Sequence, residues 1–315
     1  MEDKTVLITG GAGFIGSWLS EALVKKGAFV RVLDNFQSGS EKNLAHIMGS
    51  VELMKGDVRD YETVRTAVKG ADFIFHLAAN ASVPNSTKDP EYDFNSNAIG
   101  TFNVLKAASD SNKRPIVLYA SSAAVYGEAA YVPIDESHSL RPASFYGASK
   151  LCGEAYCRAF RNILRTKVVV LRIFNTYGPR QPRYVMYDLL KKLSRDQKNL
   201  EVLGTGKQKR DFIYVTDCVN AITSAALNTK ALGEVLNIGT GRGVSIEQLV
   251  QLVLDKLNLD GKTEVHYTKQ SWKGDVQTLV ADVSKLRTLL NYEPQVSLEN
   301  GFSSLLEWFR TAQAS

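Results

Sequence analysis

Short apolar runs and amphipathic stretches alternate along the first half of the chain. Val6–Ile8 is a continuous apolar run, which is typical of a strand covered on both faces. Residues 17–26 then carry apolar side chains at helical spacing. The same pattern predicts strands at 29–33, 51–58, 71–79 and 114–122, and helices at 61–70, at 94–110 and from 146 onward. Strands that alternate with helices indicate a parallel sheet with helices on both faces.

The pattern changes beyond about residue 177, where the elements are shorter and less regular. It predicts helices and strands at 184–193, 200–203, 216–227, 233–238 and 298–309. We therefore expect an α/β protein, with a Rossmann-type doubly wound parallel sheet in residues 1–176 and a smaller α/β substrate-binding domain in residues 177–315. Segments near 212–241 are expected to return in part to the main sheet.

A glycine-rich turn follows the first strand directly and opens the first helix. Directly after Gly10, the residues Gly11, Gly13 and Gly16 form a G-x-G-x-x-G pattern in this strand–turn–helix context. The first two glycines allow a tight turn and the approach of a pyrophosphate to bare backbone, and the third allows close packing of helix and strand. The helix N-terminus offers free N–H groups to the phosphates. This pattern predicts a dinucleotide site, against the alternative of a glycine-rich turn that binds nothing.

Two carboxylates follow the next two predicted strands. Asp34 ends the second strand eighteen residues after Gly16, where a carboxylate suits the two hydroxyls of a ribose and repels a 2′-phosphate. Asn35 and Phe36 come next, with no arginine to receive such a phosphate, so the sequence favours NAD over NADP. Asp57 is placed to reach the adenine amino group, although it also fits an ordinary surface position.

The candidate chemistry lies around residue 146. Tyr146 and Lys150 are four residues apart at the start of a predicted helix, so both project from the same face. A free tyrosine has a pKa of about 10, and a nearby ammonium together with a nicotinamide cation favours the phenolate. Ser122, at the end of a predicted strand, is placed to hold the substrate oxygen. These three groups suit the removal of a proton from an alcohol while its carbon loses hydride to NAD.

The motifs together resemble the extended short-chain dehydrogenases/reductases, and most of all the nucleotide-sugar epimerase/dehydratase group that includes the UDP-glucose 4-epimerases. The matching stretches cover nearly the whole chain. They are Thr9–Gly16, Leu33–Asn35, Gly56–Val58, His76–Ala79, Asn97–Thr101, Ser121–Gly127, Tyr146–Lys150, Arg172–Pro179, Arg210–Val215 and Asn237–Gly241.

The resemblance implies a set of site residues. The implied catalytic residues are Ser122, Tyr146 and Lys150. The implied cofactor-binding residues are Gly10, Gly13, Phe14, Ile15, Gly16, Asp34, Asn35, Ser38, Gly39, Asp57, Val58, Leu77, Ala78, Ala79, Asn97, Tyr146 and Lys150. The implied substrate-binding residues are Ala81, Ser122, Ala123, Tyr146, Asn175, Arg210, Trp272 and Asp275.

The residues after Ser122 narrow the reaction that the resemblance implies. The 4,6-dehydratases carry Asp-Glu before Val-Tyr-Gly, and the UDP-glucuronate decarboxylases carry a glutamate there, whereas this chain has Ala123 and Ala124. Alanine cannot transfer a proton, which favours C4 epimerisation of a nucleotide-diphosphate sugar through a transient 4-keto sugar. A reductase, dehydrogenase or decarboxylase acting on a nucleotide sugar remains an alternative, as does a non-catalytic regulator that senses NAD.

Two departures from the family pattern concern the nucleotide. Trp272 stands where UDP-glucose 4-epimerases usually have an arginine, and it cannot grip a phosphate as a guanidinium does. Ala81 replaces a familiar lysine. Both departures leave the C4 chemistry untouched, but they leave the nucleotide and the sugar open.

Composition and charge set the remaining expectations. Three cysteines in 315 residues argue against a disulfide framework, and four scattered histidines show no metal-ligand spacing, so no metal is expected. The formal net charge of +5 is mild, and no run of eighteen apolar residues occurs, so neither nucleic acid nor a membrane is expected as a partner. Met1 leads at once into the first strand, which predicts no signal peptide and a cytoplasmic protein. We expect a homodimer from the resemblance.

Overall fold

The larger part of the molecule is built on a parallel sheet. The computed structural model describes residues 1–272 and 274–314. Seven strands pair in the order β10-β6-β5-β4-β1-β2-β3, and every neighbouring pair is parallel. Their bounds are β1 Thr5–Thr9, β2 Phe29–Asp34, β3 Val51–Lys55, β4 Phe73–His76, β5 Ile116–Ser122, β6 Val168–Ile173 and β10 Val235–Ile238. This sheet confirms the predicted α/β fold class.

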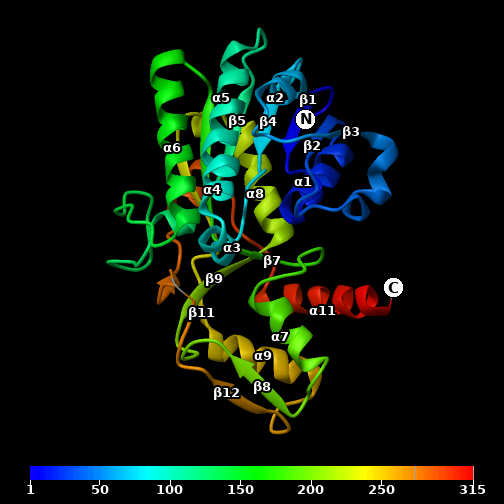
Figure 1. Cartoon of the computed structure of the whole chain (residues 1–315), viewed down its shortest axis with the longest axis vertical. Coiled ribbons are helices and arrows are strands. Elements are labelled where there is room, and N and C mark those ends of the chain that lie inside the picture. Colours follow the sequence, from blue (N-terminus) through cyan, green and yellow to red (C-terminus); the bar gives the residue numbers. More distant parts are fainter. Residues whose placement is uncertain (273, 315) are drawn as a thin grey trace.

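Helices cover both faces of the sheet, as Figure 1 shows. Alternate side chains of β1 point to opposite faces, so Val6 and Ile8 belong to one apolar cluster and Leu7 belongs to another. The first cluster is covered by α1 Phe14–Lys25, α8 Val215–Leu227 and α10 Ser284–Leu290. The second is covered by α2 Tyr61–Val68, α5 Gly100–Asp110 and α6 Phe145–Leu164. Burial on both faces explains why the strands read as continuous apolar runs.

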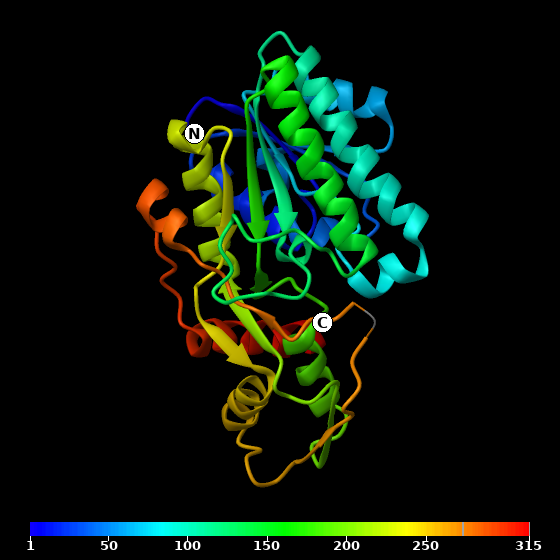
Figure 2. The same ribbon diagram turned by 90° about the vertical axis from the view of Figure 1, so that its left-hand side faces the viewer.

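The smaller part lies below the sheet in Figures 1 and 2 and has its own apolar core. A four-stranded sheet contains β7 Asn175–Tyr177, β9 Lys209–Tyr214, β11 Gly243–Ser245 and β13 Thr278–Leu279. A two-stranded sheet pairs β8 Asn199–Val202 with β12 Glu264–Tyr267. Three helices pack on them: α7 Val185–Leu193, α9 Ile246–Leu257 and α11 Leu298–Ala314.

Three expected elements differ from the observed ones. The strand expected at 51–58 ends at Lys55, because its partner β2 ends at Asp34. The strand expected at 71–79 ends at His76, because β1 gives way to the turn at Gly10, which has φ +72°. The helix expected at 94–110 contains a π-helical turn, Asn95–Ile99, between α4 Pro90–Phe94 and α5. A further short helix, α3 Val83–Lys88, precedes α4.

Strand β10 comes from the second half of the chain but pairs with β6 at the edge of the main sheet. The chain therefore returns to the sheet after forming β9, while the division at residue 177 stays a prediction. Among the described residues, no helix is both long and apolar enough to span a bilayer.

Candidate active site

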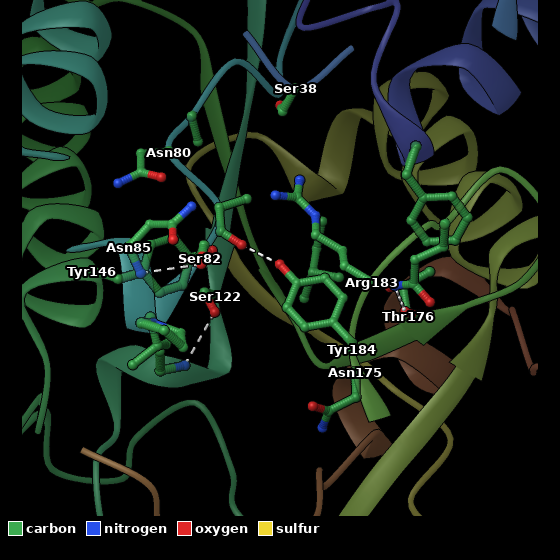
Figure 3. Close-up of a pocket in the computed structure, with 18 of the residues that line it drawn as sticks. Ser38, Asn80, Ser82, Asn85, Ser122, Tyr146, Asn175, Thr176, Arg183 and Tyr184 are labelled. Atoms are coloured by element: carbon green, nitrogen blue, oxygen red, sulfur yellow. Dashed lines mark hydrogen bonds between the residues drawn. The ribbon is translucent and has the colours of Figure 1, made fainter. Parts of the chain in front are cut away.

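A cavity of about 1140 Å³ lies between the carboxyl edge of the main sheet and the smaller part. Parallel strands end at a common edge, and the loops that follow β1, β2, β4 and β5 all contribute to its wall. Figure 3 shows Ser38, Asn80 and Ser122 from the sheet side together with Asn175, Thr176 and Tyr184 from the opposite side. The cavity exceeds the volume of most small-molecule pockets, so it has room for two ligands.

The glycine turn forms one end of the cavity. A Cβ at Gly10 would lie 2.7 Å from the Ala78 backbone nitrogen, and one at Gly16 would lie 2.1 Å from the Gly10 carbonyl oxygen. Only glycine allows this close approach. Helix α1 begins at Phe14, so its first N–H groups open into the cavity beside Gly13. This cradle fits a diphosphate.

Asp34 presents a buried carboxylate next to that cradle. One carboxylate oxygen accepts a hydrogen bond from the Ala12 N–H at 2.9 Å and the other accepts from the Phe36 N–H at 2.8 Å. Burial raises the pKa of Asp34, and these two hydrogen bonds act in the opposite direction. Each oxygen keeps a lone pair for a ribose hydroxyl. The described arginines that line the cavity, Arg183 and Arg210, both come from the smaller part, so none stands beside Asp34 for a 2′-phosphate.

Asp57 lies at the same end of the cavity and has fixed partners. Its carboxylate accepts from the Asn35 amide at 2.8 Å and from two nitrogens of Arg59 at 2.9 and 2.8 Å. Burial opposes ionisation, but the hydrogen bonds from Arg59 and Asn35 hold the pKa of Asp57 at about 2. The carboxylate is therefore ionised and suited to accept from an amino group.

Tyr146 and Lys150 project from the first turns of α6 toward the end of β5. Ser144 caps this helix by accepting from the Gly147 N–H at 3.1 Å, which fixes where the helix begins. The Lys150 ammonium is buried and donates to the Ala120 carbonyl oxygen at 2.8 Å. Tyr146 shares a hydrogen bond with the Ser122 side chain.

The pKa values of this pair differ from those of free side chains. Burial raises the pKa of Tyr146, the neighbouring Tyr184 raises it further, and the hydrogen bond with Ser122 lowers it. The net direction is upward, opposite to the lowering that the sequence analysis expects from Lys150 and a nicotinamide. Burial lowers the pKa of Lys150 to about 8. In the protein alone, Tyr146 is therefore a phenol.

The substrate side of the cavity is lined by Asn175, Arg210, Trp272 and Asp275. Arg210 pairs with Asp275 at 2.5 Å and donates to the Val276 carbonyl oxygen at 2.7 Å. Its guanidinium thus holds the loop that carries Trp272, which is about half exposed (45%). The Asn175 amide donates to the Asp211 carbonyl oxygen at 3.3 Å.

All but two of the residues implied by the resemblance line this cavity. Gly39 packs behind Asp34, where a Cβ would lie 3.0 Å from a carboxylate oxygen. Asn97 is 1% exposed, and its amide bonds to the Asn80 backbone, to Asp93 and to Ser149. Both residues support the cavity wall from behind. Within the described residues, no three His, Cys, Asp or Glu side chains gather to hold a metal.

Sequence reasoning missed Arg183 and Tyr184, which form the wall facing Ser122 in Figure 3. Tyr184 has φ +73°, and its hydroxyl donates to the Ala81 carbonyl oxygen across the cavity. The Arg183 guanidinium lies over the Tyr184 ring, 5.5 Å from its centre. The available signal was Pro182-Arg-Tyr184 directly after the Gly178-Pro-Arg turn, but nothing local showed which way these side chains point.

Comparison with known proteins places the chain in a family. Residues 7–305 match the family model described as GDP-mannose 4,6 dehydratase. A putative UDP-glucose 4-epimerase of Methanocaldococcus jannaschii is 34% identical, over 97% of this chain and 98% of its own length. UDP-glucuronic acid decarboxylase 1 of Xenopus tropicalis is 35% identical, over 98% of this chain and 72% of its own.

A solved structure supports the same relationship. UDP-glucuronic acid 4-epimerase from Bacillus cereus, in complex with UDP-glucuronic acid and NAD, has a TM-score of 0.89 and 29% identity, over 98% of this chain and 99% of its own. The chain belongs to the NAD-dependent nucleotide-sugar epimerase/dehydratase family of extended short-chain dehydrogenases/reductases. It is an enzyme of that family, and its cofactor is NAD.

Proposed function

We propose that the enzyme inverts C4 of a UDP-sugar of the UDP-glucose/UDP-galactose type through a transient 4-keto sugar. The observation that carries this proposal is the arrangement around Ser122. The serine, Tyr146 and Lys150 share one wall with the glycine cradle, while Ala123 and Ala124 supply no acid or base for elimination or for handling a carboxylate.

The side chains around Ser122 suit this reaction. NAD bound at the cradle supplies the acceptor, and later the donor, of the C4 hydride. Tyr146 takes the proton of the 4-hydroxyl group, and the Ser122 hydroxyl donates a hydrogen bond to the same oxygen. The Lys150 ammonium stabilises the phenolate. When the keto sugar has turned over, Tyr146 returns its proton to the C4 oxygen, and the hydride held on the bound cofactor would go back to the opposite face of C4, so the reaction needs no net oxidant.

Cationic side chains that suit a diphosphate lie along the cavity, together with an equal number of carboxylates among its described lining residues. The described cationic residues of its lining are Lys88, Lys150, Arg183, Lys191, Lys192 and Arg210. The exposed ring of Trp272 offers a flat apolar surface for a base or a sugar. The UDP-sugars named for the two relatives support uridine as the nucleotide, because both relatives match nearly all of this chain.

The test is to offer UDP-glucose, UDP-N-acetylglucosamine, UDP-glucuronate and GDP- or CDP-sugars with no added cofactor and to follow the products by NMR. We expect a C4 epimer and no net change in NAD. Release of carbon dioxide and a UDP-pentose from UDP-glucuronate would instead identify a decarboxylase. Turnover only with added reduced cofactor would identify a reductase.

We also propose that the enzyme is a homodimer. Helix α6 exposes Tyr156, Ile163 and Leu164, at 41%, 76% and 50% of their surface, and such side chains favour contact with a second copy. Sedimentation in solution tests this assembly. The cytoplasmic location stays a prediction.

A further inference from the structure

Lys150 is a cation in an almost closed environment, with 3% of its surface exposed. Such a charge needs a negative partner to remain protonated. Six ionisable groups face it from α4, α6, β4 and β5. They are Asp93, Tyr146, Glu154, Cys157, His76 and Tyr119, whose ring centre lies 5.2 Å from the Lys150 nitrogen.

Most of these groups carry no negative charge. Burial raises the pKa of Cys157, of Tyr119 and of Tyr146, so each stays protonated. Burial and the charge of Lys150 lower the pKa of His76 to about 3, so its ring is neutral. The negative charge near Lys150 must therefore come from Glu154 or Asp93.

Glu154 is already neutralised by another cation. Its carboxylate forms two close contacts with Arg172, at 2.7 Å from Nη2 and 3.0 Å from Nε. It also accepts a hydrogen bond from the Ser121 hydroxyl at 2.5 Å. Lys150 lies one helical turn from Glu154. At that distance the opposite charges of the Glu154–Arg172 pair largely cancel.

Asp93, in contrast, has only neutral partners. It is 1% exposed, and its carboxylate accepts from the Asn80 amide at 3.1 Å, from the Asn97 amide at 3.1 Å and from the Ser149 hydroxyl at 2.6 Å. The Asn97 amide is oriented by the Asn80 N–H, which donates to its oxygen at 2.8 Å. Across residues 1–272 and 274–314, no lysine, arginine or histidine nitrogen lies within 4.0 Å of it.

Burial raises the pKa of Asp93, while the hydrogen bond from Ser149, the charge of Lys150 and the hydrogen bond from Asn80 oppose this and favour the ionised form. All three neighbours point donors at it, and the 2.6 Å bond from Ser149 has the length of a hydroxyl–carboxylate bond with a charged acceptor. The π-helical turn Asn95–Ile99 brings Asn97 back toward Asp93, four residues earlier in the chain. The fold therefore maintains a buried carboxylate beside the residue that precedes Lys150.

We propose that Asp93 is a positioning residue that acts through Lys150: its fixed negative charge keeps the lysine protonated, and its bond to Ser149 fixes the helical turn that carries Tyr146 and Lys150. The proposal rests on the proposed roles of Tyr146 and Lys150. Because a negative charge favours the ammonium and disfavours the phenolate, Asp93 raises the pKa of both groups.

Asp93→Asn removes the charge and keeps an acceptor for Ser149. While Lys150 is still protonated, we expect the phenolate absorbance of Tyr146 in the NAD-bound enzyme to titrate at lower pH by about one unit, because the repulsion from Asp93 is gone. The limb of the pH–rate profile that reports the Lys150 ammonium should also move to lower pH. The absorbance of the other tyrosines is measured in Tyr146→Phe and subtracted. Ser149→Ala removes the hydrogen bond and leaves the Asp93 carboxyl group in place, so it should lower turnover with a smaller shift of the titration than Asp93→Asn.

The titration needs no sugar, so it tests the role of Asp93 even if the NMR assay detects no epimer. An unshifted titration in Asp93→Asn, or an equal shift in Ser149→Ala, would overturn the proposal. Thermal unfolding of Asp93→Asn, Lys150→Met and the double variant provides a second measurement. We expect the double variant to have a higher Tm than Asp93→Asn, because no buried cation is left unpaired. A double variant that is less stable than either single variant would also overturn it.

Discussion

In the proposed reaction Tyr146 must lose a proton near neutral pH, although its surroundings oppose this. Burial raises its pKa, and the nearby charge of Asp93 acts in the same direction. The positive charges of Lys150 and of a bound nicotinamide must therefore provide the opposing effect. The proposed mechanism therefore requires the bound cofactor for Tyr146 to act as a base.

Tyr146→Phe should abolish turnover while NAD stays bound. The change removes the proton acceptor and leaves the ring, so we expect turnover to fall by at least about 100-fold, the usual contribution of a positioned acid–base group. Turnover is measured by NMR, and NAD by its release on denaturation. Tyr156→Phe is the matched control, because that hydroxyl lies on the exposed side of the same helix. A Tyr146→Phe variant with full turnover would exclude the assigned role.

At the scale of residues, the sequence predicted those parts of the site that local motifs define. The glycine cradle, Asp34 and the Tyr146–Lys150 pair all line the cavity. Tyr184 was missed because its partner, the Ala81 carbonyl, lies 103 residues earlier in the chain. The role inferred for Asp93 likewise depends on contacts from a loop and a helix that are distant in sequence.

At the scale of elements, the packing of α6 on β5 sets the distance from Tyr146 and Lys150 to Ser122. Tyr119 of β5 is fully buried, and its hydroxyl donates to the Lys150 carbonyl oxygen at 3.1 Å. Gly153 leaves the space that this hydroxyl fills, since a Cβ there would lie 2.2 Å from it. The glycine brings helix and strand close together at the point where the reactive groups meet.

Gly153→Ala should therefore destabilise the protein, although alanine is normally the better helix former by about 1 kcal/mol. Here the added methyl group would collide with Tyr119, and the cost of this overpacking outweighs the gain in helix propensity. We expect a net loss of about 1–3 kcal/mol in the free energy of unfolding, together with lower turnover. Urea unfolding measures the first quantity. Gly49→Ala is the control, because a Cβ at Gly49 meets no atom within 4 Å. Equal stability of the two variants would contradict the packing argument.

Elements with continuous apolar runs or clear helical spacing were predicted well, and those defined by tertiary context were not. The capping box of α9, formed by Ser245 and Gln248, is a local signal for the start of that helix. Strand β13 has two residues and exists only because β9 pairs with it. The π-helical turn before α5 depends on buried polar contacts of Asn97 that no spacing reveals.

At the scale of the whole molecule, the cavity depends on the relative position of the main sheet and the smaller part. Helix α1 connects the two. Its Trp18 ring nitrogen donates to the Pro179 carbonyl oxygen at 3.0 Å. Arg180 stacks over the Trp18 ring at 4.4 Å and pairs with Glu21 at 2.7 Å. Because α1 also begins at the glycine cradle, one helix joins the cofactor end of the cavity to the loop that leads to Tyr184.

This connection predicts a pH-dependent stability. Burial opposes ionisation of Glu21, but hydrogen bonds from Lys25, Arg180 and His46 lower its pKa from 4.5 to about 2. A carboxylate with a lowered folded-state pKa stabilises the fold fully above its unfolded value, and this contribution is lost as pH falls toward the folded value. Glu21→Gln should thus lower Tm by about 1–2 °C at pH 7, for a loss near 1 kcal/mol.

The difference in Tm between wild type and Glu21→Gln should close between pH 4.5 and pH 2, because both proteins then carry a neutral side chain at this position. Calorimetry at a series of pH values follows this closure. Lys25→Met separates the two ion pairs of Glu21, since Lys25 is 71% exposed and its pair should contribute little. A Tm difference that persists at pH 2, or an equal loss in Lys25→Met, would show that the link through Arg180 does not stabilise the molecule.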